Sequence, residues 1–224
     1  VISNTLVYSN SALFGGGIWS NGGTSRVTVD GNSRIAANVA SIYAGGIGNT
    51  DGSFTVNASQ IYANDGSTYG GGLYDGYSGR LTVNDSQVYS NTAQQGGGVY
   101  SEGAAQVTIS ASRVTTNTAG DAGGGLFNID SGITVTNNSL VRANTAGSTG
   151  GGIHSTINSL TATVVVSNSS LLGNIAPTGS AFQQAGGTSR VTGSCIVDNS
   201  NTVVNYAGGT SPVAATGHWW GHAS

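Results

Sequence analysis

Carboxylates are the most reactive side chains that recur along this chain. Asp51, Asp75, Glu102 and Asp130 follow one another at nearly regular intervals. If successive repeats stack, these residues occupy the same inter-strand turn and could line up as a file of calcium ligands, because Ca²⁺ prefers oxygen ligands. Asp also suits solvated turns that hold no ligand, so both interpretations stay open.

Catalysis would require such groups to converge, and the sequence shows no sign of convergence. Polysaccharide-active enzymes on parallel β-helices place paired carboxylates in one cleft. Here nine acidic and six basic residues are spread over 224 positions. The single Cys195 excludes an internal disulfide, and Trp and Gly between His218 and His222 disfavour a helical metal site. We expect no catalytic residue, no metal and no cofactor, with calcium at the turn carboxylates as the alternative.

Aromatic residues recur next to a glycine run. Alternation predicts that they point outward from a strip that the glycines leave bare, where they could contact the apolar faces of sugar rings. The alternative is that identical rings on neighbouring strands stack on one another and stabilise the sheet by a few tenths to about 1 kcal/mol per pair. The residues are Trp19, Tyr74, Tyr100, Phe127 and His154, with Gly48 and Gln183 at equivalent positions.

A second outward file consists of threonines. Regular threonine files on flat solenoids can bind ice, whereas threonine is also an ordinary exposed strand residue. The neighbouring side chains, such as Arg26 and Asp30, are unlike one another, which disfavours an ice-binding face. The file comprises Thr28, Thr55, Thr82, Thr108, Thr134 and Thr192, and Val165 interrupts it.

A repeat of about 27 residues, a length typical of solenoid units, must position all of these side chains. All eight units hold an apolar-x-x-Asn motif, six of them also hold a Gly-rich run that ends in an aliphatic residue, and most hold an apolar-Thr-apolar alternation. Three short strands separated by turn residues cannot bury their apolar faces alone, but stacked copies can. The sequence therefore predicts an all-β, right-handed parallel β-helix of about eight turns with three strands per turn. Alternation points Ser86, Val88 and Ser90 inward.

The asparagine of each motif should lie at a turn. Identical amides from successive turns can then form a hydrogen-bonded ladder that satisfies backbone groups at the bend. The predicted ladder is Asn10, Asn38, Asn64, Asn91, Asn117, Asn144, Asn174 and Asn199. We expect one domain over 1–224, with repeats at 1–199 and a C-terminal cap segment at 200–224 in which Trp219 and Trp220 cover the last turns.

The paired motifs resemble the FxxN and GGAI repeats of polymorphic outer-membrane protein passengers and related bacterial β-helix surface proteins. This chain has Gly where that family usually has Ala, and Ile or Val where it usually has Phe. The ending His218-Trp219-Trp220-Gly221 is similar to the Trp-Trp-Gly ending of many bacterial β-helix repeat proteins. The resemblance implies a secreted or surface location and adhesive or structural work, and no catalytic residue can be carried over.

Composition agrees with an exported protein. The net charge is −3 and lysine is absent, which disfavours nucleic acid as a partner, and no apolar run is long enough to insert into a membrane. Val1 in place of Met suggests a processed or excised segment. We expect a non-enzymatic, extracellular or cell-surface solenoid that associates head-to-tail or with neighbouring domains of a longer chain. The alternatives are a carbohydrate-binding or polysaccharide-active β-helix and an ice-binding protein.

Overall fold

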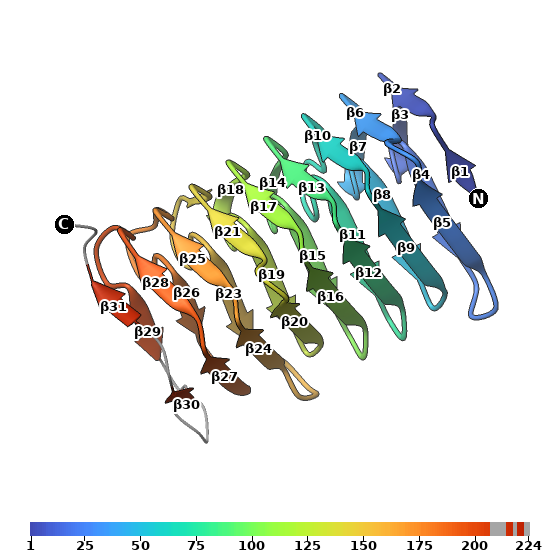
Figure 1. The fold of residues 1–224 in the computed structure, drawn as a ribbon. Helices are drawn as coiled ribbons and strands as arrows, with labels where there is room; N and C mark the ends of the chain where they lie inside the picture. Colours follow the sequence, from blue (N-terminus) through green and yellow to red (C-terminus); the bar gives the residue numbers. More distant parts are fainter. Residues whose placement is uncertain (207–213, 217–218, 222–224) are drawn as a thin grey trace.

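The chain folds as a parallel β-helix in which each repeat forms one turn of a solenoid. The computed structural model describes residues 1–206, 214–216 and 219–221, and these contain strands and turns but no helix. Among these residues there is accordingly no helix long and apolar enough to cross a membrane. Equivalent strands of successive repeats lie side by side along the rod (Figure 1) and pair in parallel. The predicted fold class is confirmed.

Three long sheets form the walls of the solenoid. The first sheet contains β1 (Ile2–Ser3), β5 (Arg26–Asp30), β9 (Ser53–Asn57), β12 (Arg80–Asn84), β16 (Gln106–Ser110), β20 (Gly132–Thr136), β24 (Thr163–Ser167), β27 (Thr188–Thr192) and β30 (Ala214–Thr216). The second contains β2 (Leu6–Tyr8), β6 (Arg34–Ala36), β10 (Gln60–Tyr62), β13 (Gln87–Tyr89), β17 (Arg113–Thr115), β21 (Leu140–Arg142), β25 (Ser170–Leu172), β28 (Cys195–Val197) and β31 (Trp219–Gly221). The third contains β4 (Ile18–Asn21), β8 (Ile47–Thr50), β11 (Leu73–Gly76), β15 (Val99–Glu102), β19 (Leu126–Ile129), β23 (Ile153–Thr156), β26 (Phe182–Gln184) and β29 (Val204–Tyr206).

A fourth, irregular row of strands joins the second sheet to the third, and the sequence had not predicted it. It consists of a two-stranded and a three-stranded sheet, which isolated bridges such as Tyr43 to Tyr69 and Tyr69 to Gln95 extend along the rod. The strands are β3 (Ser11–Phe14), β7 (Val39–Tyr43), β14 (Thr92–Gln95), β18 (Thr118–Ala122) and β22 (Thr145–Ala146). Register shifts interrupt the pairing, so no clean alternation marked this row in the sequence.

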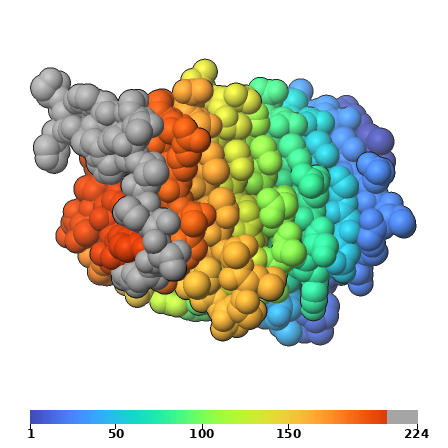
Figure 2. All heavy atoms as spheres, turned by 90° about the horizontal axis from the view of Figure 1, so that it is seen from below, coloured from blue at the N-terminus to red at the C-terminus, as the bar shows by residue number. Residues whose placement is uncertain are grey.

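Alternating aliphatic side chains from the three long sheets fill one continuous core. The centre of the second sheet shows the regularity best, since Ile35, Ile61, Val88 and Val114 are fully buried and pair directly along the rod. Each such side chain contributes roughly 1.5–3 kcal/mol relative to an exposed position. Successive turns occupy successive slices of the molecule (Figure 2), so every core residue contacts mainly its own and adjacent turns.

The predicted asparagine ladder is confirmed. From Asn38 to Asn199, each ladder Oδ1 accepts hydrogen bonds from the backbone N–H and the Nδ2 of the asparagine one turn earlier, at 2.9–3.1 Å throughout. The Nδ2 groups of the same seven asparagines also donate to backbone carbonyls of the second sheet, as Asn91 does to Ile61 at 3.0 Å. The six ladder members from Asn38 to Asn174 are buried. The ladder thus provides hydrogen-bond partners for backbone N–H groups and for backbone carbonyl groups at this corner.

The residue before each ladder asparagine turns the chain. All eight of these residues have a left-handed backbone, with φ between 52° and 58°. The expected inward orientation of Ser90 is therefore wrong, because the strand ends at Tyr89 and the turn exposes the next side chain. Ser86 and Val88 do point inward as expected.

Serines form a second ladder at the corner between the first and second sheets. The hydroxyl of Ser86 accepts from Ser59 N at 3.1 Å, and the hydroxyl of Ser112 accepts from Ser86 N at 3.1 Å. Each hydroxyl also donates to a carbonyl at the end of the first-sheet strand, as Ser86 does to Asn84 at 2.6 Å. Side-chain ladders therefore hold two of the corners at which the chain passes from one sheet to the next.

Replacing one ladder asparagine should destabilise the solenoid strongly. In Asn91→Ala four hydrogen bonds disappear and the buried Asn64 N–H, Ile61 carbonyl and Asn117 amide lose partners, so we expect a loss of about 3 kcal/mol or more in urea unfolding. The control is Asn84→Ala, which removes one partly exposed bond to Asn57 and should cost less than about 1 kcal/mol. Equal losses would contradict the role of the ladder.

Candidate functional site

The recurring aromatic residues form one stacked row on the outward side of the third sheet. We call Trp19, Tyr74, Tyr100, Phe127 and His154 the buried aromatic row. Ring centroids lie 5.9 Å apart for Tyr74–Tyr100, 5.0 Å for Tyr100–Phe127 and 4.9 Å for Phe127–His154, with interplanar angles of 4° to 8°. The ring faces therefore contact one another, which is the stacking alternative derived from the sequence.

The fourth row of strands covers this stack. Its own aromatic residues, Phe14, Tyr43 and Tyr69, are aligned along the rod, and we call them the covering aromatics. Tyr43 packs on Tyr74 and Tyr69 packs on Tyr100, each with centroids 4.8 Å apart.

The expected exposure of the buried aromatic row is consequently wrong for most of its length. Tyr74, Tyr100 and Phe127 are only 2–4% exposed and His154 is 9% exposed, whereas Trp19 is half-buried. The glycines do not leave a bare strip either. A Cβ on Gly98 would lie 2.5 Å from the Gly125 carbonyl oxygen, so these glycines allow the backbones of successive turns to approach closely.

Trp19 lies over a gap in the row. Its equivalent one turn later is Gly48, where a Cβ would meet Trp19 Cε3 at 2.2 Å. The indole thus occupies the space of the missing side chain and reaches Tyr74, two turns away, with centroids 5.9 Å apart and planes at 19°. Phe14 also packs against the indole, with ring centroids 5.6 Å apart. The indole is held in place by contacts from three turns.

An aromatic cleft opens beside Trp19, between the covering aromatics and the corner that follows the third sheet. Its volume is about 330 Å³. Asp51 and Tyr77 occupy equivalent corners of successive turns, and the Ser78 N–H donates to Asp51 Oδ1 at 3.1 Å. The lining residues are Phe14, Trp19, Tyr43, Tyr74 and Tyr77 with the polar residues Asn21, Thr50 and Asp51.

The proposed calcium file of turn carboxylates is wrong. Strand register places Asp75 opposite Ser101 and Glu102 opposite Ile129, so Asp75 and Glu102 do not align. Glu102 instead accepts hydrogen bonds from the phenols of Tyr74 and Tyr100, at 2.5 and 3.3 Å. No group of three or more His, Cys, Asp or Glu side chains within the described residues is arranged to hold a metal ion. The pKa of both phenols is raised, mainly by burial and next by the neighbouring Glu102.

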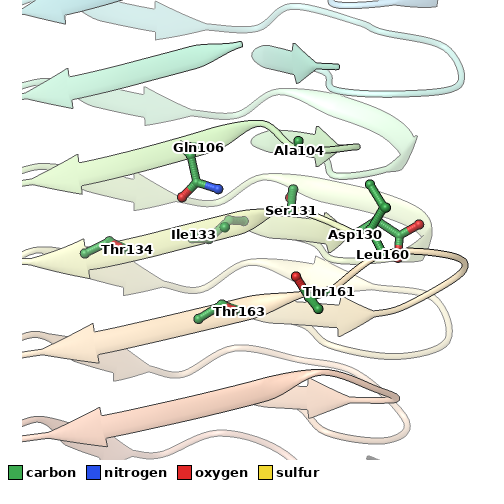
Figure 3. Close-up of a pocket in the computed structure, with 10 residues that line it drawn as sticks. Ala104, Gln106, Asp130, Ser131, Ile133, Thr134, Leu160, Thr161 and Thr163 are labelled. Atoms are coloured by element: carbon green, nitrogen blue, oxygen red, sulfur yellow. The ribbon is translucent and has the colours of Figure 1, made fainter. Parts of the chain in front are cut away.

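Asp130 secures a loop rather than a cation. Its carboxylate accepts hydrogen bonds from the backbone N–H groups of Asn158 and Ser159 at 2.8–3.2 Å. Burial raises its pKa, but these N–H groups and that of Leu160 outweigh burial and lower the pKa below the usual value. Leu160 and Thr161 of this loop line a groove of about 390 Å³ on the first sheet (Figure 3). Gln106 lies across Gly132 there, and the other lining groups are mostly hydroxyl or aliphatic.

A line of buried polar side chains runs inside the corner between the third and first sheets, and no motif in the sequence predicted it. Amide nitrogens in this line hold the corner loops, because Asn49 donates to the Gly52 carbonyl at 3.1 Å and Gln184 to the Gly187 carbonyl at 2.7 Å. The line comprises Ser20, Asn49, Asp75, Ser101, Asn128, Ser155 and Gln184.

Asp75 is the one carboxyl group in this line. Burial raises its pKa to about 8, although the 2.7 Å hydrogen bond from Asn49 and a backbone N–H from Leu81 oppose the change. Its Oδ2 is buried without a partner. A protonated Asp75 can donate as the neighbouring amides do, so the neutral form suits this position.

The threonine file is shorter than predicted. Thr28, Thr55, Thr82, Thr108 and Thr134 align on the first sheet, but Arg190 follows Val165 in this file, and Thr192 pairs with Ser167 in the next one. A charged residue interrupts the face that ice binding would require.

The structure describes only part of the segment that was expected to form a C-terminal cap. Backbone strands β29, β30 and β31 continue the third, first and second sheets, so the segment expected to be a cap extends the solenoid. The side chains of Trp219 and Trp220, and residues His218 and His222, lie outside the described residues. Cys195 is a free, half-buried thiol.

Comparisons of this chain with protein-family models, curated proteins and solved structures found no match.

Two buried titratable groups should give the stability an opposite dependence on pH. The pKa of Asp75 is raised to about 8, so its contribution falls as the pH rises from about 4 to about 8. Burial lowers the pKa of His154 to about 4, despite Asp121, so its contribution falls as the pH drops from about 6.5 to about 4. Each slope is at most about 1.4 kcal/mol per pH unit.

Urea unfolding of two variants between pH 4 and pH 9 checks this. Asp75→Asn should remove the decline above pH 6.5 and be more stable than the wild type at pH 8. His154→Phe should leave that decline intact and change only the slope between about pH 4 and 6.5. An Asp75→Asn profile parallel to that of the wild type would show that Asp75 is not buried inside the solenoid.

Proposed function

We propose that this chain is a non-enzymatic, extracellular solenoid with a structural and adhesive role. The observation that supports this most directly is the unbroken asparagine ladder, which fixes successive turns to one another from Asn10 to Asn199. A rod whose corners are satisfied by its own side chains keeps its shape without a disulfide, a metal or a partner. Such a rod can hold a binding surface at a fixed place outside the cell.

The reactive side chains support the same role, because the fold itself uses them. Glu102 bonds two tyrosines, Asp130 holds a loop, and Asp75 is inside the solenoid. Core side chains of the first turn, including Ile2, Val7 and Ile18, are only partly buried at the open edge of the sheets. They suit stacking against another solenoid turn, from a second copy or from a longer chain. Head-to-tail association is therefore part of the proposal.

Two assays on the purified chain test the proposal together. Thermolysin at 25 °C should leave the solenoid intact for hours, because its bonds open only with neighbouring turns. Incubation with a panel of plant, microbial and animal polysaccharides should release no new reducing ends or unsaturated products. Polysaccharide turnover that Asp51→Asn or Glu102→Gln abolishes would overturn the non-enzymatic assignment, and cleavage throughout the repeats within minutes would overturn the rigid rod.

A further inference from the structure

The aromatic cleft combines two kinds of surface that rarely lie exposed together. Trp19 and Tyr43 are half-buried rings, and Tyr77 is 65% exposed. Polar groups of Asn21 and Asp51 face the same space. Carbohydrates need this combination, because a sugar ring has apolar C–H faces and hydroxyl groups at its edge.

Two rings of the cleft, those of Trp19 and Tyr43, are positioned before any ligand arrives. Trp19 packs against Phe14 and Tyr74 and lies over Gly48. Tyr43 stacks on Tyr69 with centroids 5.3 Å apart and planes at 20°. Binding to such a surface costs little ordering entropy, because the side chains are already fixed.

Tyr77 differs from the other rings. It takes part in none of the ring–ring contacts found within the described residues and is 65% exposed, so much of its ring is accessible to a ligand. Its left-handed backbone, with φ of 60°, sits directly beside the equivalent Asp51, with φ of 61°. The hydrogen bond from Ser78 N to Asp51 Oδ1 joins the two corners. This bond fixes the Asp51 carboxylate relative to the backbone of the corner that carries Tyr77.

The polar groups offer both a donor and an acceptor. Asn21 Oδ1 accepts from the Thr50 hydroxyl at 3.0 Å, which orients the amide so that its NH₂ group is the part left to bind a ligand. Asp51 is exposed and accepts through its carboxylate. A carboxylate and an amide can together bind adjacent hydroxyls of a sugar.

Charge and size narrow the ligand class. Among the described residues, the lining of the cleft includes the carboxylate of Asp51 and no basic residue, and the chain carries a net charge of −3, so binding of an acidic sugar is disfavoured. A volume of about 330 Å³ is at the lower end of the range for small-molecule sites, which suits a mono- or disaccharide unit rather than a long chain.

We propose that the aromatic cleft at Trp19, Tyr77 and Asp51 binds a neutral hexopyranose unit of a glycan. This inference rests on the proposed adhesive role and names its ligand class. The ligand's ring packs on the aromatic residues, and its hydroxyls bond Asp51 and Asn21.

Titration of the full chain with neutral disaccharides tests the proposal. The probes are lactose, cellobiose, maltose and mannobiose, with digalacturonate as the acidic comparison, followed by NMR of the Trp19 indole N–H, which Trp19→Phe assigns. At least one neutral disaccharide should shift this signal with a millimolar or lower Kd, and digalacturonate should bind at least tenfold more weakly. Tyr77→Ala and Asp51→Asn should each weaken binding at least fivefold.

The matched control is Tyr8→Ala, because Tyr8 is 56% exposed but lies on the second sheet, away from the cleft. Its substitution should leave binding unchanged. The proposal is overturned if no neutral disaccharide binds, if digalacturonate binds best, or if Tyr77→Ala and Tyr8→Ala have equal effects. Thermolysin resistance of the same samples separates this failure from that of the rod, since a resistant chain that binds no sugar retains only its structural role.

Discussion

The asparagine ladder is the interaction on which the rest of the structure depends. A tight bend between parallel strands leaves backbone N–H and carbonyl groups that no sheet can pair, and a buried unpaired group costs about 1–3 kcal/mol. Here each bend also needs a left-handed residue, including the β-branched Thr116 with φ of 53°. The ladder offsets this strain by bonding the backbone on both sides of every bend. Sheets, core and outer rows all follow from the stacking that it fixes.

The regular spacing of the repeat was enough to predict the fold and the ladder, because repeats that stack must align identical residues. It was not enough to predict burial. Alternation correctly pointed Tyr100 away from the core, but the fourth row of strands folds over it, and Gln95 and Ala122 there lack any repeating pattern. Gly98 was interpreted as bare surface, whereas it lies where two backbones meet. Outward from a sheet is therefore not the same as exposed.

Strand register explains why the turn carboxylates do not form the predicted file of calcium ligands. Asp75 and Glu102 are about one repeat apart in the sequence. However, Asp75 aligns with Ser101 and points into the solenoid, whereas Glu102 is the next residue and points outward, because the repeats differ slightly in length. A shift of one position moves a side chain to the opposite face. Thr192 lies two positions beyond the threonine file, because Arg190 pairs with Val165 and Thr192 pairs with Ser167. The aromatic cleft arises from a similar irregularity, since Gly48 breaks the row at the one place where Trp19 can fill it.

The most direct test of the ladder is hydrogen exchange of asparagine side-chain amides, followed by NMR on the full chain. The Nδ2 protons of Asn64, Asn91 and Asn117 are bonded and buried, so they should exchange at least a hundredfold more slowly than those of the exposed Asn138. Protection should persist until neighbouring turns open together. Exchange of the ladder amides as fast as that of Asn138 would contradict the central role of the ladder.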